Sequence, residues 1–254
     1  MLYFRELCRA GGGAIDACEM TRALLRGEDA VGYCCVRPSG HHAEPDRAMG
    51  FCLFDNVAVA AAMAIEDLGL KRVMVLDWDV HHGNGTAEIF RRRDDVLFFS
   101  IHQSPLYPGS GAATDLGSGP GEGYTVNLPV PPGSGEEIWL SLVEHIVVPI
   151  AESFGPELIL ISAGFDGHRE DLLAGCNLEA SSFAQMTCHV RDLARRLGVP
   201  LGAVQEGGYH LGSLVESLLA TMAALGGEGK ARGAAAAEAL TPRAAATVAP
   251  YWPL

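Results

Sequence analysis

Basic residues are scarce in this chain of 254 residues. Lys and Arg together number 18 against 31 Asp and Glu, which leaves a formal net charge of −13. A surface with this charge repels phosphate backbones, so we do not expect direct binding of nucleic acid. It would tolerate or attract cationic substrates. The sequence also lacks any run of about 18 consecutive apolar residues, the length that a membrane-spanning helix requires.

The cysteine pattern argues against a disulfide framework. The seven cysteines are odd in number and contain no CxxC pair, and Cys34 and Cys35 lie in an apolar stretch. This pattern is typical of free thiols in a reducing compartment. The opening residues MLYFRELCRA carry charge throughout, unlike a secretory signal peptide. We therefore expect a soluble cytoplasmic protein that does not contact a membrane.

Short apolar runs alternate with helical patterns along the chain. The runs are nearly continuous, as in strands covered on both faces, and they span 30–36, 72–78, 95–101, 124–130, 157–163 and 199–205. Helical spacing occurs at 56–68, 84–93, 135–154, 181–197 and 210–225. This alternation predicts an α/β fold with a central, mostly parallel sheet and helices on both faces. We expect one domain over 1–254, in which the Ala-rich stretch 229–249 is either a frayed helix or a mobile segment.

Unusual polar residues follow three of the predicted strands. Asp77, Asp79 and His81 come at the end of 72–78, Asp166 follows 157–163, and Tyr209 follows 199–205. In open parallel sheets, ligands bind beyond the carboxyl ends of the strands. Titratable groups at the mouth of a buried strand are costly to hold there unless something binds them. Two long loops rich in Gly, Pro and His, 37–55 and 102–123, are also typical of functional loops.

The spacing of these polar residues favours a metal site. Asp79 and His81 are two residues apart, so both would point to one side of an extended segment, and Asp77 shares that parity. With Asp166 as third ligand, two carboxylates and one imidazole leave a coordination position open, which is typical of a catalytic metal. Taken singly, each cluster has a plainer interpretation: paired histidines can form a capped turn, and EGGYH a turn before a helix. Together, the clusters predict a metal-dependent active site.

Six segments, in order along the chain, resemble the histone deacetylase family. They are RPSGHHA, GFCLFDN, LDWDVHHGNGT, YPGSG, SAGFDGHRED and QEGGY. The HHGN and GFDGH forms are similar to the class II branch, which includes bacterial deacetylase-like amidohydrolases and acetylpolyamine amidohydrolases. The resemblance runs from about residue 10 to the terminal PYWPL. It implies an arginase-like α/β fold and a zinc-dependent hydrolase of amides.

The resemblance also implies roles for individual residues. The metal ligands would be Asp79, His81 and Asp166. Of the tandem histidines, His42 would be the general base that later protonates the leaving amine, and His41 its electrostatic partner.

Three further residues complete the implied catalytic set. Tyr209 would bind the substrate carbonyl through its hydroxyl. Asp77 would lie behind His41, and Asn84 behind His42, each accepting a ring N–H and thereby fixing the tautomer.

These roles agree with the chemistry of amide hydrolysis. A neutral acetamide is a poor electrophile, so a metal is needed to polarise its carbonyl and to lower the pKa of a water molecule. The water needs a base with a pKa near neutrality, which favours histidine. The developing oxyanion needs a second donor, and a phenol supplies one without adding charge. Gly207 and Gly208 would let Tyr209 swing into place, in a hinge-like role.

The family also binds potassium, mostly through backbone oxygens. By resemblance, the nearer potassium site would be formed by Asp77, Asp79, His81, Ser100 and Ile101. The farther site would be formed by Phe90, Arg93, Val96 and Tyr124. A narrow tunnel for an extended aliphatic chain would be lined by Gly50, Phe51 and Tyr107, although both aromatic residues could equally belong to the core.

Other residues of the motifs are not expected to take part in the reaction. Structural packing is the favoured interpretation of His82, His168 and His210. Ser39 stands where the family usually has a second proline, and Asp55 where it often has asparagine, so both bear on the geometry around the site and not on the reaction.

The resemblance begins late in the family pattern. Family members have a considerable stretch before the segment AGGGAIDA, including an edge strand and part of the tunnel rim, whereas here MLYFRELCRAGGGAIDA (1–17) is expected to be that helix. One sheet edge and one wall of the site would then be missing or supplied by a partner subunit. Because an uncovered edge strand invites pairing, a homodimer is a reasonable hypothesis.

Three functional hypotheses follow. The leading one is hydrolysis of an N-acetyl amide, on a small molecule such as an acetylated polyamine or on acetyl-lysine in a peptide. An arginase-type ureohydrolase shares the fold but usually needs two bridged metals and more acidic ligands. The third is a non-catalytic module that binds an acetylated ligand, inactive because the N-terminal segment is missing. Asp, His and Asp suit Zn²⁺ and Fe²⁺ alike.

Overall fold

The computed structural model describes residues 2–234 and 239–254, with side chains from residue 11 onward. At its centre is one sheet of six strands in the order β1-β6-β5-β2-β3-β4, and all neighbouring strands are parallel. The strands are β1 (Val31–Cys34), β2 (Val73–Asp77), β3 (Val96–Gln103), β4 (Thr125–Val130), β5 (Leu158–Ala163) and β6 (Leu201–Gln205). All six predicted strands are therefore confirmed.

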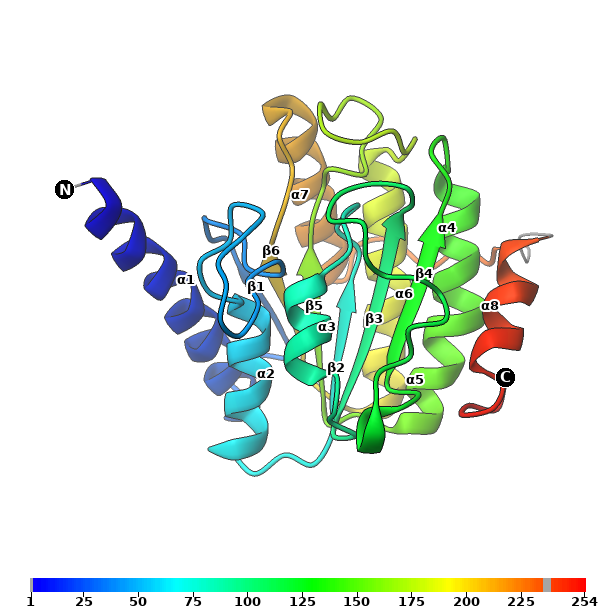
Figure 1. Cartoon of the computed structure of the whole chain (residues 1–254), viewed down its shortest axis with the longest axis horizontal. Helices are drawn as coiled ribbons and strands as arrows, with labels where there is room; N and C mark the ends of the chain where they lie inside the picture. The colour runs from blue at the N-terminus through cyan, green and yellow to red at the C-terminus, as the bar shows by residue number, and fades with distance from the viewer. Residues whose placement is uncertain (1, 235–238) are drawn as a thin grey trace.

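Helices cover both faces of this sheet (Figure 1). One face carries α1 (Leu2–Leu25), α2 (Asn56–Glu66) and α3 (Asn84–Phe90). The opposite face carries α4 (Glu136–Leu142), the π-helical segment η2 (Val143–Val147), α5 (Val148–Phe154), α6 (Ala180–Leu197), α7 (Leu211–Leu225) and α8 (Leu240–Val248). A short 3₁₀ helix, η1 (Gly119–Gly121), precedes β4. The predicted three-layer α/β fold is confirmed.

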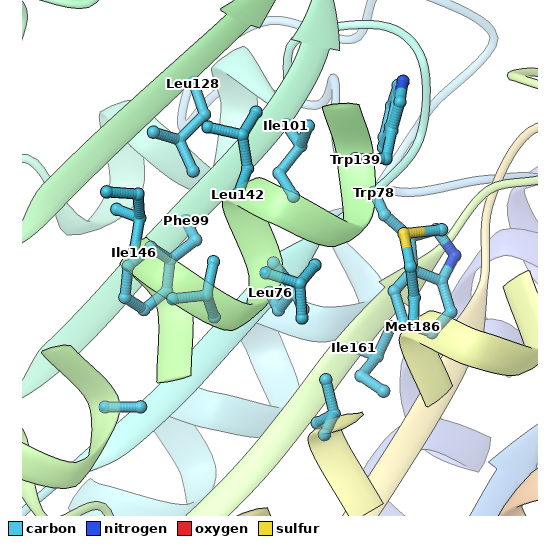
Figure 2. Close-up of a cluster of buried hydrophobic side chains, with 14 of the residues drawn as sticks. Leu76, Trp78, Phe99, Ile101, Leu128, Trp139, Leu142, Ile146, Ile161 and Met186 are labelled. Atoms are coloured by element: carbon cyan, nitrogen blue, oxygen red, sulfur yellow. The ribbon is translucent and has the colours of Figure 1, made fainter. Parts of the chain in front are cut away.

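The sheet separates two hydrophobic cores. In β2, Val73 and Val75 pack on the side of α1, α2 and α3, whereas Met74 and Leu76 face the larger core on the other side. Figure 2 shows that larger core, in which Leu76 lies among side chains from the sheet and from the helices that cover it. Burying each such side chain contributes roughly 1.5–3 kcal/mol. Burial on both faces explains why the strands are nearly continuous apolar runs.

The register of the central strands positions the site. Asp77, the last residue of β2, pairs with Ser162 of β5 and with Ser100 of β3. Gln205, the last residue of β6, pairs with Ala163 of β5. The segments that follow β2, β5 and β6 therefore leave the sheet at one edge and at the same level. Polar residues from three distant parts of the sequence meet there.

The Ala-rich stretch 229–249 is helical over α8. This helix packs against α4, η2 and β4. The hydroxyls of Thr241 in α8 and Ser141 in α4 lie 2.7 Å apart. Beyond it, the indole of Trp252 donates a hydrogen bond to the carbonyl of Gly123 at 2.7 Å. Residues 235–238 lie outside the described part of the chain. None of the helices in the described residues is both long enough and apolar enough to cross a membrane.

Candidate active site

The turns after β2 and β5 bring Asp79, His81 and Asp166 together. One ligand atom from each of the three lies within 4.8 Å of the others. The Nδ1 atom of His81 lies 3.1 Å from Asp79 Oδ1 and 3.1 Å from Asp166 Oδ2. All three residues are buried. The structure therefore groups the three residues that the sequence singled out as metal ligands.

The local conformation that groups them is not the extended one that we expected. The carboxylate of Asp77 accepts a hydrogen bond from the amide of Asp79 at 3.0 Å. The carboxylate of Asp79 in turn accepts one from the amide of His81 at 2.9 Å. Both are bonds from a side chain to the backbone two residues on, which bend the chain. The argument from strand alternation is wrong beyond Asp77, where β2 ends; successive turns replace it.

Two glycines make room for the two acidic ligands. A Cβ atom on Gly207 would overlap the carboxylate oxygens of Asp166 and Asp79, and one on Gly164 would overlap Asp79. The amide of Gly207 also donates a hydrogen bond to Asp79 Oδ2 at 2.8 Å. Close approach to the carboxylates thus requires glycine at position 207. The hinge role expected for Gly207 and Gly208 stays a prediction.

The electrostatics of this group suit a divalent cation. Burial, together with the Asp79 carboxylate, raises the pKa of Asp166 to about 6. Burial would also raise the pKa of Asp79, but the imidazoles of His41 and His81 outweigh burial and hold it well below its usual value. Two carboxylates buried side by side repel each other, and a bound cation would offset both the repulsion and the loss of hydration. Two carboxylates and one imidazole form a donor set that fits Zn²⁺ or Fe²⁺.

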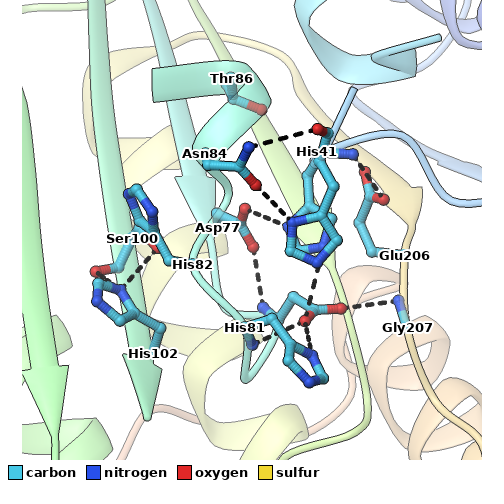
Figure 3. Close-up of polar contacts among 12 residues, drawn as sticks. His41, Asp77, His81, His82, Asn84, Thr86, Ser100, His102, Glu206 and Gly207 are labelled. Atoms are coloured by element: carbon cyan, nitrogen blue, oxygen red, sulfur yellow. Dashed lines mark hydrogen bonds and ion pairs between the residues drawn. The ribbon is translucent and has the colours of Figure 1, made fainter. Parts of the chain in front are cut away.

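The tandem histidines lie beside the metal group, each with the partner that we expected. His41 Nδ1 is 2.9 Å from Asp77 Oδ2 (Figure 3). His42 Nδ1 is 2.8 Å from Asn84 Oδ1. The two rings are stacked at a tilt, with centroids 4.0 Å apart. These side chains come from the loop after β1, the end of β2 and the start of α3.

The pKa values of the two tandem histidines shift in opposite directions. Burial lowers the pKa of His41, but the carboxylates of Asp77 and Asp79 outweigh it and raise the pKa well above its usual value. Burial and the neighbouring His41 lower the pKa of His42 to about 3. These opposite shifts make His41 the more readily protonated of the two histidines and leave His42 neutral. A neutral His42 can accept a proton, but its pKa of about 3 lies below the near-neutral value that we expected for a general base.

Glu44, which the sequence analysis missed, fixes the tautomer of His42. The side-chain nitrogen of Asn84 lies 2.6 Å from Glu44 Oε1 and can only donate to it. The oxygen of Asn84 must then face His42 and accept the proton on Nδ1. This leaves the lone pair of His42 on Nε2. The amide at position 84 therefore selects the tautomer that a base requires.

A cavity of about 520 Å³ opens next to these groups. Its lining residues are His42, Gly50, Phe51, His81, Leu106, Tyr107, Leu173 and Tyr209. All three residues predicted for the tunnel are among them. Phe51 and Tyr107 are 76% and 47% exposed, so the alternative that they are core aromatics is wrong. Sequence reasoning missed Leu106 and Leu173, because isolated leucines in loops carry no signal of their own.

Phe51 offers a direct test of the cavity wall. It has a φ of 64°, a left-handed conformation that a bulky residue rarely adopts, and its ring lies 6.1 Å from that of Tyr209. We expect Phe51→Ala to raise KM about 3- to 10-fold with little change in kcat, because it removes contact area and no reacting group. Steady-state kinetics measure this. Leu219→Ala, at a residue 60% exposed on α7 and outside the cavity wall, is the matched control; an equal rise in KM there would contradict the prediction.

The remaining histidines of the motifs have structural contacts. His82 Nδ1 lies 2.8 Å from Ser110 Oγ. This contact connects the loop that carries Tyr107 to the segment after β2 that carries Asp79 and His81. His168 Nδ1 accepts a hydrogen bond from the amide of Glu170 at 3.2 Å. His210 caps α7 by accepting one from the amide of Ser213 at 3.3 Å. All three contacts fit the packing role that we favoured.

The residues implied for potassium lie near opposite ends of β3. Asp77 and Ser100 of the nearer set are paired in register at the ligand-binding edge of the sheet. In the farther set, the carbonyl of Phe90 accepts a hydrogen bond from the amide of Arg93 at 2.9 Å. The carbonyl of Tyr124 accepts one from β3. Both cation sites stay predictions.

Two departures from the motifs have clear contacts. Asp55 caps α2 by accepting the amide of Ala58 at 2.9 Å, and its other oxygen accepts the hydroxyl of Thr86 at 2.8 Å. Ser39 Oγ accepts a hydrogen bond from the guanidinium of Arg37 at 3.3 Å. Asp55 therefore fastens α2 to α3 next to the site and takes no part in the metal group.

Comparisons with known proteins all indicate one family. The model of the histone deacetylase domain matches residues 3–225. The chain is 47% identical over 207 residues to the histone deacetylase-like amidohydrolase of Pseudomonas aeruginosa, covering 80% of this chain and 54% of that protein. It is 42% identical over 228 residues to the chloroplastic histone deacetylase 10 of Oryza sativa, covering 89% of this chain and 52% of that protein. The chain thus spans about half the length of these curated relatives.

The fold has a close match among solved structures. The crystal structure of the HDA15 HD domain superposes with a TM-score of 0.89 at 38% sequence identity. The match covers 96% of this chain and 68% of that one.

Proposed function

Because the chain belongs to the histone deacetylase family, we propose that it is a metal-dependent hydrolase that cleaves an N-acetyl amide to a free amine and acetate. One observation carries the proposal above all: Asp79, His81 and Asp166 converge next to a cavity that His42 and Tyr209 also line. These side chains would supply, in one place, ligands for a divalent ion, a neutral base and a hydroxyl donor.

The metal would be held by Asp79, His81 and Asp166, with Zn²⁺ as the leading candidate and Fe²⁺ as the alternative. When bound, it would polarise the acetyl carbonyl and lower the pKa of a water molecule. The proposal extends to structural potassium ions at the two sets of residues that the family resemblance implies.

The protein's own residues would carry the proton transfers. His42 would accept a proton from the attacking water at Nε2 and return it to the leaving amine. The positive charge on His41, held by Asp77, would stabilise the negative charge that develops on the substrate. Burial, with the carboxylates of Asp79 and Asp166, raises the pKa of Tyr209 far above its usual value, so its hydroxyl stays protonated as a donor.

The shape of the cavity bears on the substrate. Apolar and aromatic side chains, among them Phe51, Leu106 and Leu173, make up much of its lining. Such walls suit an aliphatic chain that carries the acetyl group at its end. We propose acetyl-lysine or an acetylated polyamine as the substrate. The net charge of −13 favours approach of a cationic substrate.

The described side chains disfavour the arginase-type alternative. The part of the chain that the structure describes holds one cluster of side chains able to bind a metal ion, with two carboxylates and one imidazole. Two bridged metals would need more acidic ligands around the same point.

A panel of acetylated amines tests the proposal. The full chain, loaded with Zn²⁺ and with its metal content measured, is incubated with an acetyl-lysine peptide and with acetylated polyamines. We expect release of free amine at about one metal ion per chain, inhibition by a hydroxamate, and loss of turnover in His42→Ala. Folded, fully metallated protein that binds these ligands without releasing amine would instead support the non-catalytic binding module.

A further inference from the structure

Two loops that carry proposed catalytic groups are joined by Arg37. This residue lies four positions before His41 in the loop after β1. Its guanidinium donates hydrogen bonds to the carbonyl of Glu206 at 3.1 Å and to the carbonyl of Gly208 at 2.9 Å. Both acceptors belong to the loop after β6 that carries Tyr209. Because the arginine binds one carbonyl on each side of Gly207, it holds that loop in a defined position.

Glu206 makes the same kind of contact in the opposite direction. Its Oε2 atom accepts hydrogen bonds from the amides of Gly40 at 2.6 Å and His41 at 3.2 Å. Figure 3 shows this carboxylate beneath the backbone of His41. Glu206 has no exposed surface, and its Oε1 atom has no hydrogen-bond partner among the described residues. A carboxyl group is costly to bury in this way, so its two bonds to the histidine loop must offset that cost.

The two contacts are reciprocal and independent of each other. Each side chain binds the backbone of the loop that carries the other, and the structure records no bond between guanidinium and carboxylate. The Arg37 guanidinium also lies 5.6 Å from the centre of the Tyr209 ring, within the range of a cation–π contact. From the β5 side, Asp171 accepts the amide of Tyr209 at 2.7 Å. Loss of Arg37 would therefore loosen this loop without releasing it.

We propose that Arg37 and Glu206 form a reciprocal clamp that sets the position of the Tyr209 hydroxyl relative to the tandem histidines. Both are positioning residues for the hydrolysis, since neither lines the cavity next to the metal group. This inference rests on the proposed function. A base and an oxyanion donor on separate loops must be held to within a fraction of an ångström to act on one carbonyl.

Hydrogen exchange tests the clamp without requiring turnover. We expect Glu206→Ala to increase exchange in peptides that cover 37–43, where the amides of Gly40 and His41 lose their acceptor. Glu206→Gln keeps an oxygen acceptor and should restore protection. Arg37→Ala should increase exchange over 206–210, and Arg196→Ala, an exposed arginine paired with Glu152, is the matched control that should change neither peptide. Unchanged exchange in both loops would overturn the clamp.

Kinetics test the positioning role. We expect Arg37→Ala to lower kcat about 10-fold or more, with KM changed by no more than about twofold and metal content unchanged. If Tyr209 is out of place in Arg37→Ala, adding Tyr209→Phe to that variant should lower kcat by a much smaller factor than Tyr209→Phe does in the unmodified enzyme. Equal factors in both backgrounds would overturn the positioning role. Absence of turnover in the unmodified enzyme would overturn the proposed function and the positioning role with it, whereas hydrogen exchange would still decide the clamp.

Discussion

Asp166→Asn is expected to abolish tight binding of the divalent ion and, with it, measurable hydrolysis. The substitution removes one of two anionic ligands and the only proposed ligand that follows β5. Removal of partners outside the ligand sphere already costs about 10- to 100-fold in metal affinity, so loss of a ligand should cost more. The fold should tolerate the change, because an asparagine oxygen can still accept the hydrogen bond that Asp166 Oδ1 receives from the amide of Val80 at 2.9 Å.

Metal content after dialysis, thermal unfolding and turnover together measure this effect. In the unmodified protein, Zn²⁺ at about 1,000 times its Kd should add about 4 kcal/mol to the free energy of unfolding. In Asp166→Asn this increment should largely disappear. For metal content and for the Zn²⁺ increment in stability, Asp171→Asn is the matched control, since Asp171 is another buried carboxylate of the same loop but accepts hydrogen bonds from the backbone amides of Leu173, Tyr209 and His210. If Asp166→Asn retained a full complement of metal, the proposed ligand set would be incorrect.

The sheet could be predicted from the sequence because burial on both faces leaves a strong pattern. The run that ends at Leu76 is apolar at every position, and all of its residues prove to be buried. Strand ends were less certain: the run 199–205 includes Pro200, which has no amide hydrogen for the ladder, and β6 begins at Leu201. The helix expected over 1–17 continues to Leu25.

Part of the site could also be predicted, for a topological reason. Asp79 and Asp166 are far apart in the sequence, but both follow strands of one parallel sheet, and neighbouring strands deliver their carboxyl ends to one edge. Family resemblance supplied the pairing of His41 with Asp77, which the structure reproduces.

The partners within irregular loops could not be predicted. Glu44 and Glu206 read as ordinary charged residues, because no periodicity relates a loop residue to the atoms that it will contact. The turns after Asp77 were misjudged for the same reason, since side-chain to backbone bonds replaced the strand geometry there. A glutamate directly after an apolar strand, as at position 206, was the one available signal. A carboxyl group in that place needs a specific partner.

Tyr209→Phe is expected to lower kcat about 100- to 1,000-fold while leaving KM and metal content nearly unchanged. Loss of one hydrogen-bond donor to a developing oxyanion has an effect of this size, because that bond is strongest in the transition state. The substitution removes only the hydroxyl, so the ring keeps its contacts with Arg37 and Phe51. Single-turnover kinetics on metal-loaded protein measure the effect on the chemical step directly.

Tyr107→Phe provides the comparison that identifies the donor, because it removes a hydroxyl from the same cavity. Tyr107 is 47% exposed and packs edge-on against His42, with ring centroids 5.1 Å apart. The pKa of the Tyr209 phenol, by contrast, is raised by burial and also by the carboxylates of Asp79 and Asp166, two of the proposed metal ligands. Tyr107→Phe should therefore affect kcat far less than Tyr209→Phe. If the two substitutions had equal effects, or if Tyr107→Phe had the larger one, the oxyanion donor would be Tyr107 and the clamp would have no catalytic group to position.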